Sequence, residues 1–238
     1  MKTIQDYLLA SEAECFNAFY TPTSILSLNK YLYLDRQAPV CLVAHVDTLP
    51  RKKSFQLQTN NNVITVKGKG ILGADDRAGV YALNQLKDLH VNILLTSGEE
   101  SGGIGACAAA DSLDFTGVNL FIELDRKGCN QYVYYSDTLP KQIHALCQSF
   151  GYVEDYGSYS DIAEFIGHNI PAVNLSCGYY AQHTESERLH VDELELNINR
   201  VRAMISQAPT KRLKVPRAYP LEYDWDMDFR EVNRGYFR

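Results

Sequence analysis

The chain has 238 residues, of which 45% are hydrophobic and 22% charged, and its formal net charge is −6. This length suits one α/β domain with a sizeable core, and the ordinary charged fraction argues against intrinsic disorder. The acidic balance argues against a nucleic-acid partner. No apolar run is long enough for a membrane span, and charges interrupt the first twenty residues, so we expect a cytoplasmic protein without a signal peptide.

Strands and helices are predicted to alternate along the chain. In chain order we predict a buried strand (39–46), a short exposed strand (62–67), a helix (76–87), a buried strand (91–96), a helix of small residues (103–113), a buried strand (119–124), a strand (131–135), a helix (140–150), a strand (171–176) and an amphipathic helix (191–205). This alternation predicts a three-layer α/β/α sandwich around a mixed, mainly parallel sheet. Without a repeat or linker, residues 1–238 are predicted to form a single domain.

Ligands of such sheets bind beyond the carboxyl ends of the strands, and polar side chains gather at these predicted ends. His45 and Asp47 close the first buried strand. Residues two apart share a face of a strand, so Asp47 is placed to accept the second ring N–H of a metal-bound His45. Taken alone, a solvated His–Asp pair explains the same two residues equally well.

Two further segments carry adjacent carboxylates. Asp75 and Asp76 lie in a strand-to-helix turn, where acidic residues are commonly helix caps. Glu99 and Glu100 follow the strand at 91–96 in a Gly-rich turn. Because neighbouring carboxylates repel unless a cation neutralises them, the second pair favours a cation site over a solvated acidic loop.

The last two candidate ligands each have a rival nearby. Glu123 and Asp125 share a face of the strand at 119–124, and we select Asp125 because it lies at the strand's end. His183 and His190 both follow the strand at 171–176, and we select His183.

The order of these motifs resembles that of the co-catalytic zinc exopeptidases, which include peptidase T, its carboxypeptidase relatives and the bacterial leucine aminopeptidases. The resemblance covers roughly residues 39–205. It is carried by His-x-Asp (45–47), Gly-Ala-Asp-Asp-Arg-x-Gly (73–79), Thr-x-x-Glu-Glu (96–100), a strand-terminal Asp125 and His183-Thr184. The segment 160–165, Ser-Asp-x-x-x-Phe, is also similar to one in the leucine aminopeptidases. It implies a zinc-exopeptidase fold of the phosphorylase/hydrolase-like kind.

The resemblance implies two divalent metal ions and a role for seven residues. His45 and Asp125 would bind one ion, Glu100 and His183 the other, and Asp75 would bridge them, while Glu99 acts as general base and Asp47 orients His45. Two imidazoles with carboxylates suit Zn²⁺, although Co²⁺ and Mn²⁺ also fit such ligands. The resemblance further implies a cis peptide bond between Asp75 and Asp76.

This chain has room for neither of the domains that other branches of the family insert. A lid domain would follow the strand-terminal carboxylate, but only about thirty-five residues separate Asp125 from Asp161. A β-domain would precede the bridging carboxylate, where this chain has a hairpin-sized segment. Arg126 is interpreted either as a clamp for a substrate carboxylate or as a structural ion pair. Residues 211–238 form a C-terminal extension that matches no known pattern.

We therefore expect a dizinc aminopeptidase that acts on small peptides. The alternatives are an N-acyl amino-acid deacylase on the same core, or a non-catalytic metal-binding homologue. In the absence of a lid, we expect carboxylates near the site to receive the substrate's α-ammonium group, with Asp161, Glu185 and Glu187 as candidates. A helix cap or a solvated loop charge explains each of these three residues equally well. A homo-oligomer is compatible with the sequence.

Overall fold

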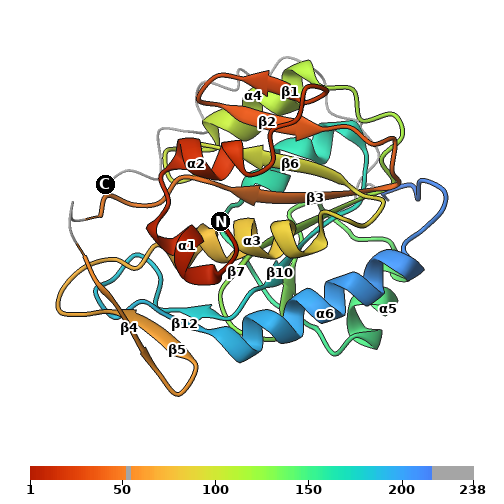
Figure 1. Cartoon of the computed structure of the whole chain (residues 1–238). Coiled ribbons are helices and arrows are strands. Elements are labelled where there is room, and N and C mark those ends of the chain that lie inside the picture. Colours follow the sequence, from red (N-terminus) through yellow and green to blue (C-terminus); the bar gives the residue numbers. More distant parts are fainter. Residues whose placement is uncertain (52–54, 216–238) are drawn as a thin grey trace, which may run out of the picture.

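A computed structural model describes residues 1–51 and 55–215. Its larger sheet is mixed and lies at the centre of the molecule (Figure 1). The strand order across this sheet is β1 (Ile25–Ser27), β2 (Tyr31–Leu34), β6 (Asn92–Thr96), β3 (Val40–His45), β7 (Leu120–Arg126), β10 (Ala172–Ser176), β8 (Gln131–Val133) and β9 (Val153–Glu154). The central neighbours β6, β3, β7 and β10 are parallel, so their carboxyl ends meet at one edge.

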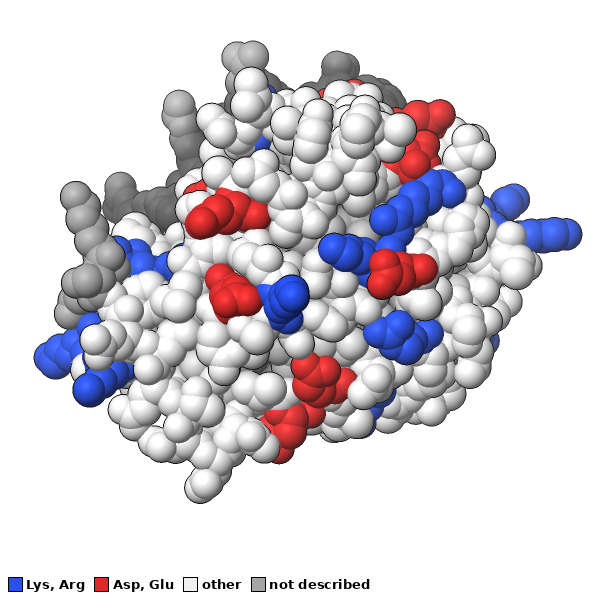
Figure 2. All heavy atoms as spheres, viewed as in Figure 1, with Lys and Arg blue, Asp and Glu red and all other residues white. Residues whose placement is uncertain are grey.

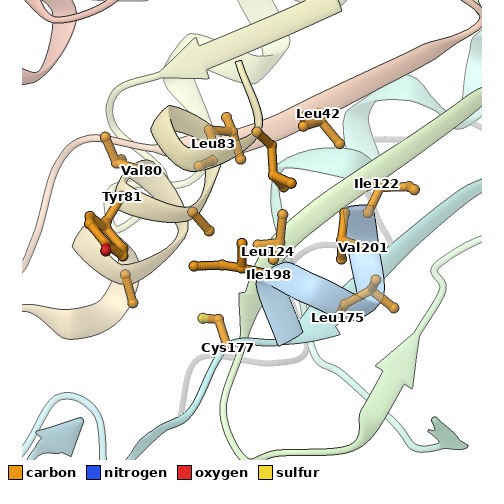
Figure 3. Packing of buried hydrophobic residues seen from close by; sticks show 14 of the residues in the cluster. Leu42, Val80, Tyr81, Leu83, Ile122, Leu124, Leu175, Cys177, Ile198 and Val201 are labelled. Carbon is orange, nitrogen blue, oxygen red and sulfur yellow. The ribbon is translucent and has the colours of Figure 1, made fainter. Parts of the chain in front are cut away.

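Helices cover both faces of this sheet, which confirms the predicted three-layer sandwich. They are α1 (Ile4–Leu9), α2 (Glu12–Asn17), α3 (Ala74–Leu86), α4 (Ile104–Ser112), α5 (Lys141–Ser149), the 3₁₀ helix η1 (Asp161–His168) and α6 (Val191–Gln207). Leu42 of β3 points to the face covered by α3 and α6, and its neighbour Val43 points to the face covered by α4 and η1. Figure 3 shows Val80 and Leu83 of α3 facing the sheet side chains on the first of these faces.

A second, smaller sheet combines segments far apart in the sequence. Its order is β11 (Tyr179–Tyr180), β12 (Arg188–His190), β5 (Val63–Val66) and β4 (Leu57–Asn60). Strands β4 and β5 form a hairpin whose two loop residues, Asn61 and Asn62, both have positive φ, as a tight two-residue turn requires. Strand β12 pairs with β5 and leads directly into α6, so the small sheet anchors the preceding loop, 181–187.

The predicted buried strands are all present, with bounds that differ by one or two residues. Not predicted from the sequence were the antiparallel strands β1 and β2 at one side of the larger sheet, the partners of the predicted strand at 62–67 and the helix η1. Helix α3 begins two residues earlier than predicted, at Ala74, although Asp75 and Asp76 have non-helical backbone angles. The predicted strand at 131–135 ends at Val133.

Among the described residues, no helix combines the length and apolar character that crossing a bilayer requires. On the face drawn in Figure 2, basic and acidic side chains are interspersed. Of the predicted C-terminal extension at 211–238, residues 216–238 lie outside the described part. Within the remainder, the Arg212 guanidinium donates hydrogen bonds to the backbone carbonyls of Phe115, Thr116 and Val118.

Candidate active site

The polar residues singled out in the sequence meet at the carboxyl edge of the central strands. His45 is the last residue of β3, Asp125 lies at the end of β7, and Glu99 and Glu100 follow β6. Asp75 lies in the first turn of α3. His183 comes from loop 181–187, which follows β11. Five segments that are distant in sequence therefore contribute to one cluster.

The Asp75 carboxylate lies between the two histidines. Its Oδ1 is 3.3 Å from Nε2 of His45, and its Oδ2 is 3.1 Å from Nε2 of His183. On the His183 side, Oε1 of Glu100 is 3.0 Å from the same ring nitrogen. On the His45 side, Oδ1 of Asp125 is 3.5 Å from Nε2 of His45. One carboxylate thus faces two groups of ligand atoms, as a bridging ligand must.

The cluster has the properties of a cation site. Nε2 of His45 is fully buried and has no hydrogen-bond partner among residues 1–51 and 55–215, although carboxylate oxygens of Asp75, Asp125 and Glu99 lie 3.3–3.9 Å away. Asp75, Glu100 and His183 each offer a ligand atom, and these three atoms lie within 4.8 Å of one another. A buried imidazole nitrogen without a hydrogen-bond partner, surrounded by carboxylates, suits a divalent metal ion such as Zn²⁺.

His45 and Asp125 are also within 4.8 Å of Asp76, but Asp76 is engaged elsewhere. Its carboxylate accepts hydrogen bonds from the backbone N–H of His45 (3.3 Å) and of Gly79 (2.9 Å). Asp76 therefore connects the end of β3 to α3, and Asp75 remains the bridging candidate. The Asp75–Asp76 peptide bond is cis, as predicted.

The electrostatics of the cluster reflect crowded carboxylates. Burial, followed by the charge of Asp75, raises the pKa of Asp125 to about 7. Burial and the neighbouring carboxylates of Asp125 and Asp75 raise the pKa of Glu99 to about 8. Burial opposes ionisation of Asp75 as well, but hydrogen bonds with His183 and His45 hold its pKa below the usual range. Opposed shifts among neighbouring groups are typical of functional sites.

Asp47 contacts His45 through two of its groups. Nδ1 of His45 lies 3.1 Å from the backbone carbonyl oxygen of Asp47 and 3.3 Å from its carboxylate, the group expected to accept the second ring N–H. The two carboxylate oxygens also accept hydrogen bonds from the backbone N–H groups of Glu99 and Glu100, each at 3.2 Å. Asp47 therefore holds both glutamates as well as His45. No local pattern predicts the contacts with the glutamates, because they cross from β3 to the turn after β6.

The two rivals of the selected ligands contact other residues. Glu123 is fully buried and accepts a hydrogen bond from the Ser160 hydroxyl. Nδ1 of His190 lies 3.7 Å from Glu193 on the first turn of α6. By contrast, Oδ1 of Asp125 accepts a hydrogen bond from the Tyr179 hydroxyl at 3.1 Å, which orients it in the cluster. The sequence analysis did not identify Tyr179.

The carboxylates expected to receive an α-ammonium group lie elsewhere. Asp161 is fully buried, accepts a hydrogen bond from the Thr96 hydroxyl and does not line the cavity beside the cluster. Glu185 is exposed, 4.0 Å from Lys69. Glu187 is buried and contacts the turn before α3. None of the three residues lines the cavity beside the cluster, so their role as contacts for the α-ammonium group stays a prediction.

A cavity of about 150 Å³ opens beside the cluster. Its lining includes four residues of the cluster, Asp75, Glu99, Asp125 and His183. The other lining residues are Arg126, Lys127, Tyr135, Ser158, Tyr159, Asn174, Tyr179 and Gln182. The Arg126 guanidinium contacts Asp155 at 2.5 Å and the Tyr156 carbonyl at 2.9 Å. Of the two interpretations of Arg126, the structure therefore shows the ion pair.

Comparison with known proteins finds a family model that matches this chain. A model of peptidase family M28 matches residues 29–200, which is most of the chain. A search of curated protein sequences finds no significant match.

Several solved structures share the fold at low sequence identity. Aminopeptidase PepT from Bacillus cereus is 15% identical, with a TM-score of 0.64 over 86% of this chain and 96% of that one. The TET1 peptidase of Pyrococcus horikoshii, which can assemble into a tetrahedron or a large octahedral shell, is 14% identical, with a TM-score of 0.64 over 85% and 99%. A zinc aminopeptidase from Bacillus subtilis is 16% identical, with a TM-score of 0.53 over 74% and 49%.

Proposed function

Because the chain belongs to peptidase family M28, we propose that it is a dizinc aminopeptidase that acts on small peptides. The family assignment confirms the resemblance to the co-catalytic zinc exopeptidases. The observation that supports the proposal best is the Asp75 carboxylate, which faces both His45 and His183 with Glu99 beside them. Such an arrangement suits hydrolysis of an amide bond by two co-catalytic ions.

In this proposal, His45 and Asp125 would hold one ion, Glu100 and His183 would hold the other, and Asp75 would be shared between them. The three ligand carboxylates offset most of the charge of two divalent ions, which lowers the cost of placing them in a half-enclosed cavity. When bound, the ions would polarise the scissile carbonyl and make water a stronger nucleophile at neutral pH. Elemental analysis is expected to give two divalent ions per chain, and His45→Ala is expected to lower that number. A single ion, retained by His45→Ala, would contradict the dinuclear site.

Glu99 is the general acid–base group in this reaction. Its carboxylate lies 3.9 Å from Nε2 of His45 and lines the cavity. Burial and the charges of Asp125 and Asp75 raise its pKa to about 8 in the metal-free protein, and two bound cations would lower that pKa and favour the carboxylate that acts as base. It would accept a proton from the attacking water and return it to the leaving amine. Asp47 positions it through the backbone N–H of Glu99.

The direction of cleavage distinguishes this proposal from a deacylase or a carboxypeptidase. The test is product analysis on one tetrapeptide in free, N-acetylated and C-amidated forms. An aminopeptidase cleaves the free and amidated forms from the amino end and spares the acetylated one. Cleavage of the acetylated form, with the amidated form untouched, would contradict the proposal and point to Arg126 as a carboxylate clamp.

Two further properties stay predictions. Self-association is a prediction that analytical ultracentrifugation can test, and the TET1 peptidase provides an example of a large assembly on this fold. The cytoplasmic location also stays a prediction.

A further inference from the structure

Glu187 makes contacts that the proposed reaction does not explain. Its side chain is buried, with 2% of the residue exposed, in a loop whose neighbouring residues 184–186 are exposed. The carboxylate accepts three backbone hydrogen bonds, from Gly73 at 2.9 Å, Ala74 at 2.8 Å and Asp75 at 3.2 Å. These donors lie more than a hundred residues away in the sequence.

The three donors lie in the turn that leads into α3. Gly73 has a left-handed conformation, and Asp75 and Asp76 have non-helical backbone angles. The regular part of the helix has a local cap, since the Asp76 carboxylate accepts a hydrogen bond from the N–H of Gly79 three residues later. The N–H groups of residues 73–75 precede that cap, and the Glu187 carboxylate accepts all three from a distant loop.

Both ends of this contact belong to the candidate metal site. One of the donors is the backbone of Asp75, whose carboxylate lies between the two histidines. Glu187 itself lies four residues after His183 in loop 181–187, which β12 anchors to β5. The contact thus joins the segment that carries Asp75 to the segment that carries His183.

We propose that Glu187 is a positioning residue that fixes Asp75 and His183 relative to each other, so that the pair is arranged for a divalent ion before the ion binds. This inference rests on the proposed function for the identity of the ligand. Residues that hold metal ligands in place affect metal affinity although they never touch the metal. No step of the proposed reaction involves Glu187 directly.

Glu187→Gln is the decisive variant because it keeps the size of the side chain. The amide oxygen can still accept from Ala74 and Asp75, but the amide NH₂ replaces the oxygen that accepts from Gly73. The amide NH₂ and the N–H of Gly73, both donors, would then face each other in a buried position, and we expect the turn to shift. Asp192→Asn is the matched control, since it makes the same chemical change on an exposed side chain in the first turn of α6.

The readout is zinc affinity, measured on the full chain by competition with a coloured chelator and without substrate. We expect Glu187→Gln to weaken binding of one of the two ions by about 10–100-fold, and Asp192→Asn to leave both unchanged. We further expect added zinc to restore the kcat of Glu187→Gln. If Glu187 only stabilised the turn, added zinc would not restore the kcat of the variant.

The outcomes separate this inference from the proposed function. Equal zinc affinities in Glu187→Gln and Asp192→Asn, in a protein that cleaves peptides, would overturn the inference alone. So would a fall in the melting temperature of the metal-free protein without any change in zinc affinity. A wild-type protein that binds two ions but cleaves none of the tetrapeptide forms would refute the proposed function, and the weakened affinity of Glu187→Gln would still support the inference.

Discussion

Replacing Gly79 by alanine should destabilise the protein strongly. A Cβ at this position of α3 would lie 2.1 Å from the carbonyl oxygen of Leu124 and 2.4 Å from each carboxylate oxygen of Asp76. Real Cβ atoms do not approach other atoms closer than 3.0 Å, so α3 would have to move about 0.9 Å away from β7. The atom of Leu124 belongs to the backbone of a central strand, and no rotamer change can relieve the contact.

The expected loss combines two effects. Overpacking of a core costs about 1–3 kcal/mol, and a contact with backbone belongs at the upper end of that range. The shift also weakens the hydrogen bond from the Gly79 N–H to the buried Asp76 carboxylate, at about 1–2 kcal/mol. The gain from alanine's higher helix propensity, about 1 kcal/mol, offsets part of this loss. We therefore expect a net destabilisation of about 2–4 kcal/mol.

Urea unfolding of the metal-free protein measures this difference directly, since the midpoint shifts while the slope stays constant. In thermal unfolding, the same loss corresponds to roughly 4–16 °C for a chain of this size. Gly167→Ala is the control, because a Cβ there meets no atom within 4 Å. A Gly79→Ala protein within about 0.5 kcal/mol of the wild type, like the control, would refute the reasoning.

Two further predictions follow from the site. Glu99→Ala should keep its metal and lose about 10²–10⁴-fold in kcat, because it removes only the general acid–base group. Glu100→Ala should lose an ion, because it removes a proposed ligand. Elemental analysis and kinetics on both variants test this assignment, and reversed phenotypes would contradict it. In the metal-free protein, the hydrogen bond with Asp75 raises the pKa of His183 to about 9. Since the folded pKa exceeds the unfolded one, the stabilisation is complete below about pH 6.5 and is lost as the pH rises through about 9. Melting temperatures of the wild type and His183→Ala between about pH 6 and 10 should converge, and a constant difference would refute this prediction.

The sequence predicted the central strands correctly because both of their faces are buried. The runs 39–46 and 91–96 are mostly apolar, and the structure buries every residue of β3 and β6. The edge strand β1 gave no such signal, since Ile25 and Leu26 are exposed on a strand of three residues. The pairing of β5 with β12 joins residues more than a hundred positions apart, and no local pattern encodes it.

Within the candidate site, the order of motifs predicted which residues come together but not how they are held. A carboxylate in a sequence looks the same whether it faces a substrate, a metal or a backbone N–H. The sequence is therefore compatible with Glu187 as a contact for the α-ammonium group or as a cap, and only the structure shows that its acceptor oxygens face the turn before α3. Asp47 was assigned to His45 alone, because its hydrogen bonds to Glu99 and Glu100 depend on the neighbouring positions of β3 and β6.

The hairpin β4–β5 has a consequence for engineering the chain. It lies between Asp47 and Asp75 in the sequence, yet its turn at Asn61 is exposed and contributes nothing to the cavity. The entropic cost of lengthening a surface turn grows only slowly with the number of added residues. We therefore expect that a folded domain can be inserted at Asn61 if its own termini lie close together. Strands β4 and β5 on either side of the insertion would keep the candidate site in its present geometry.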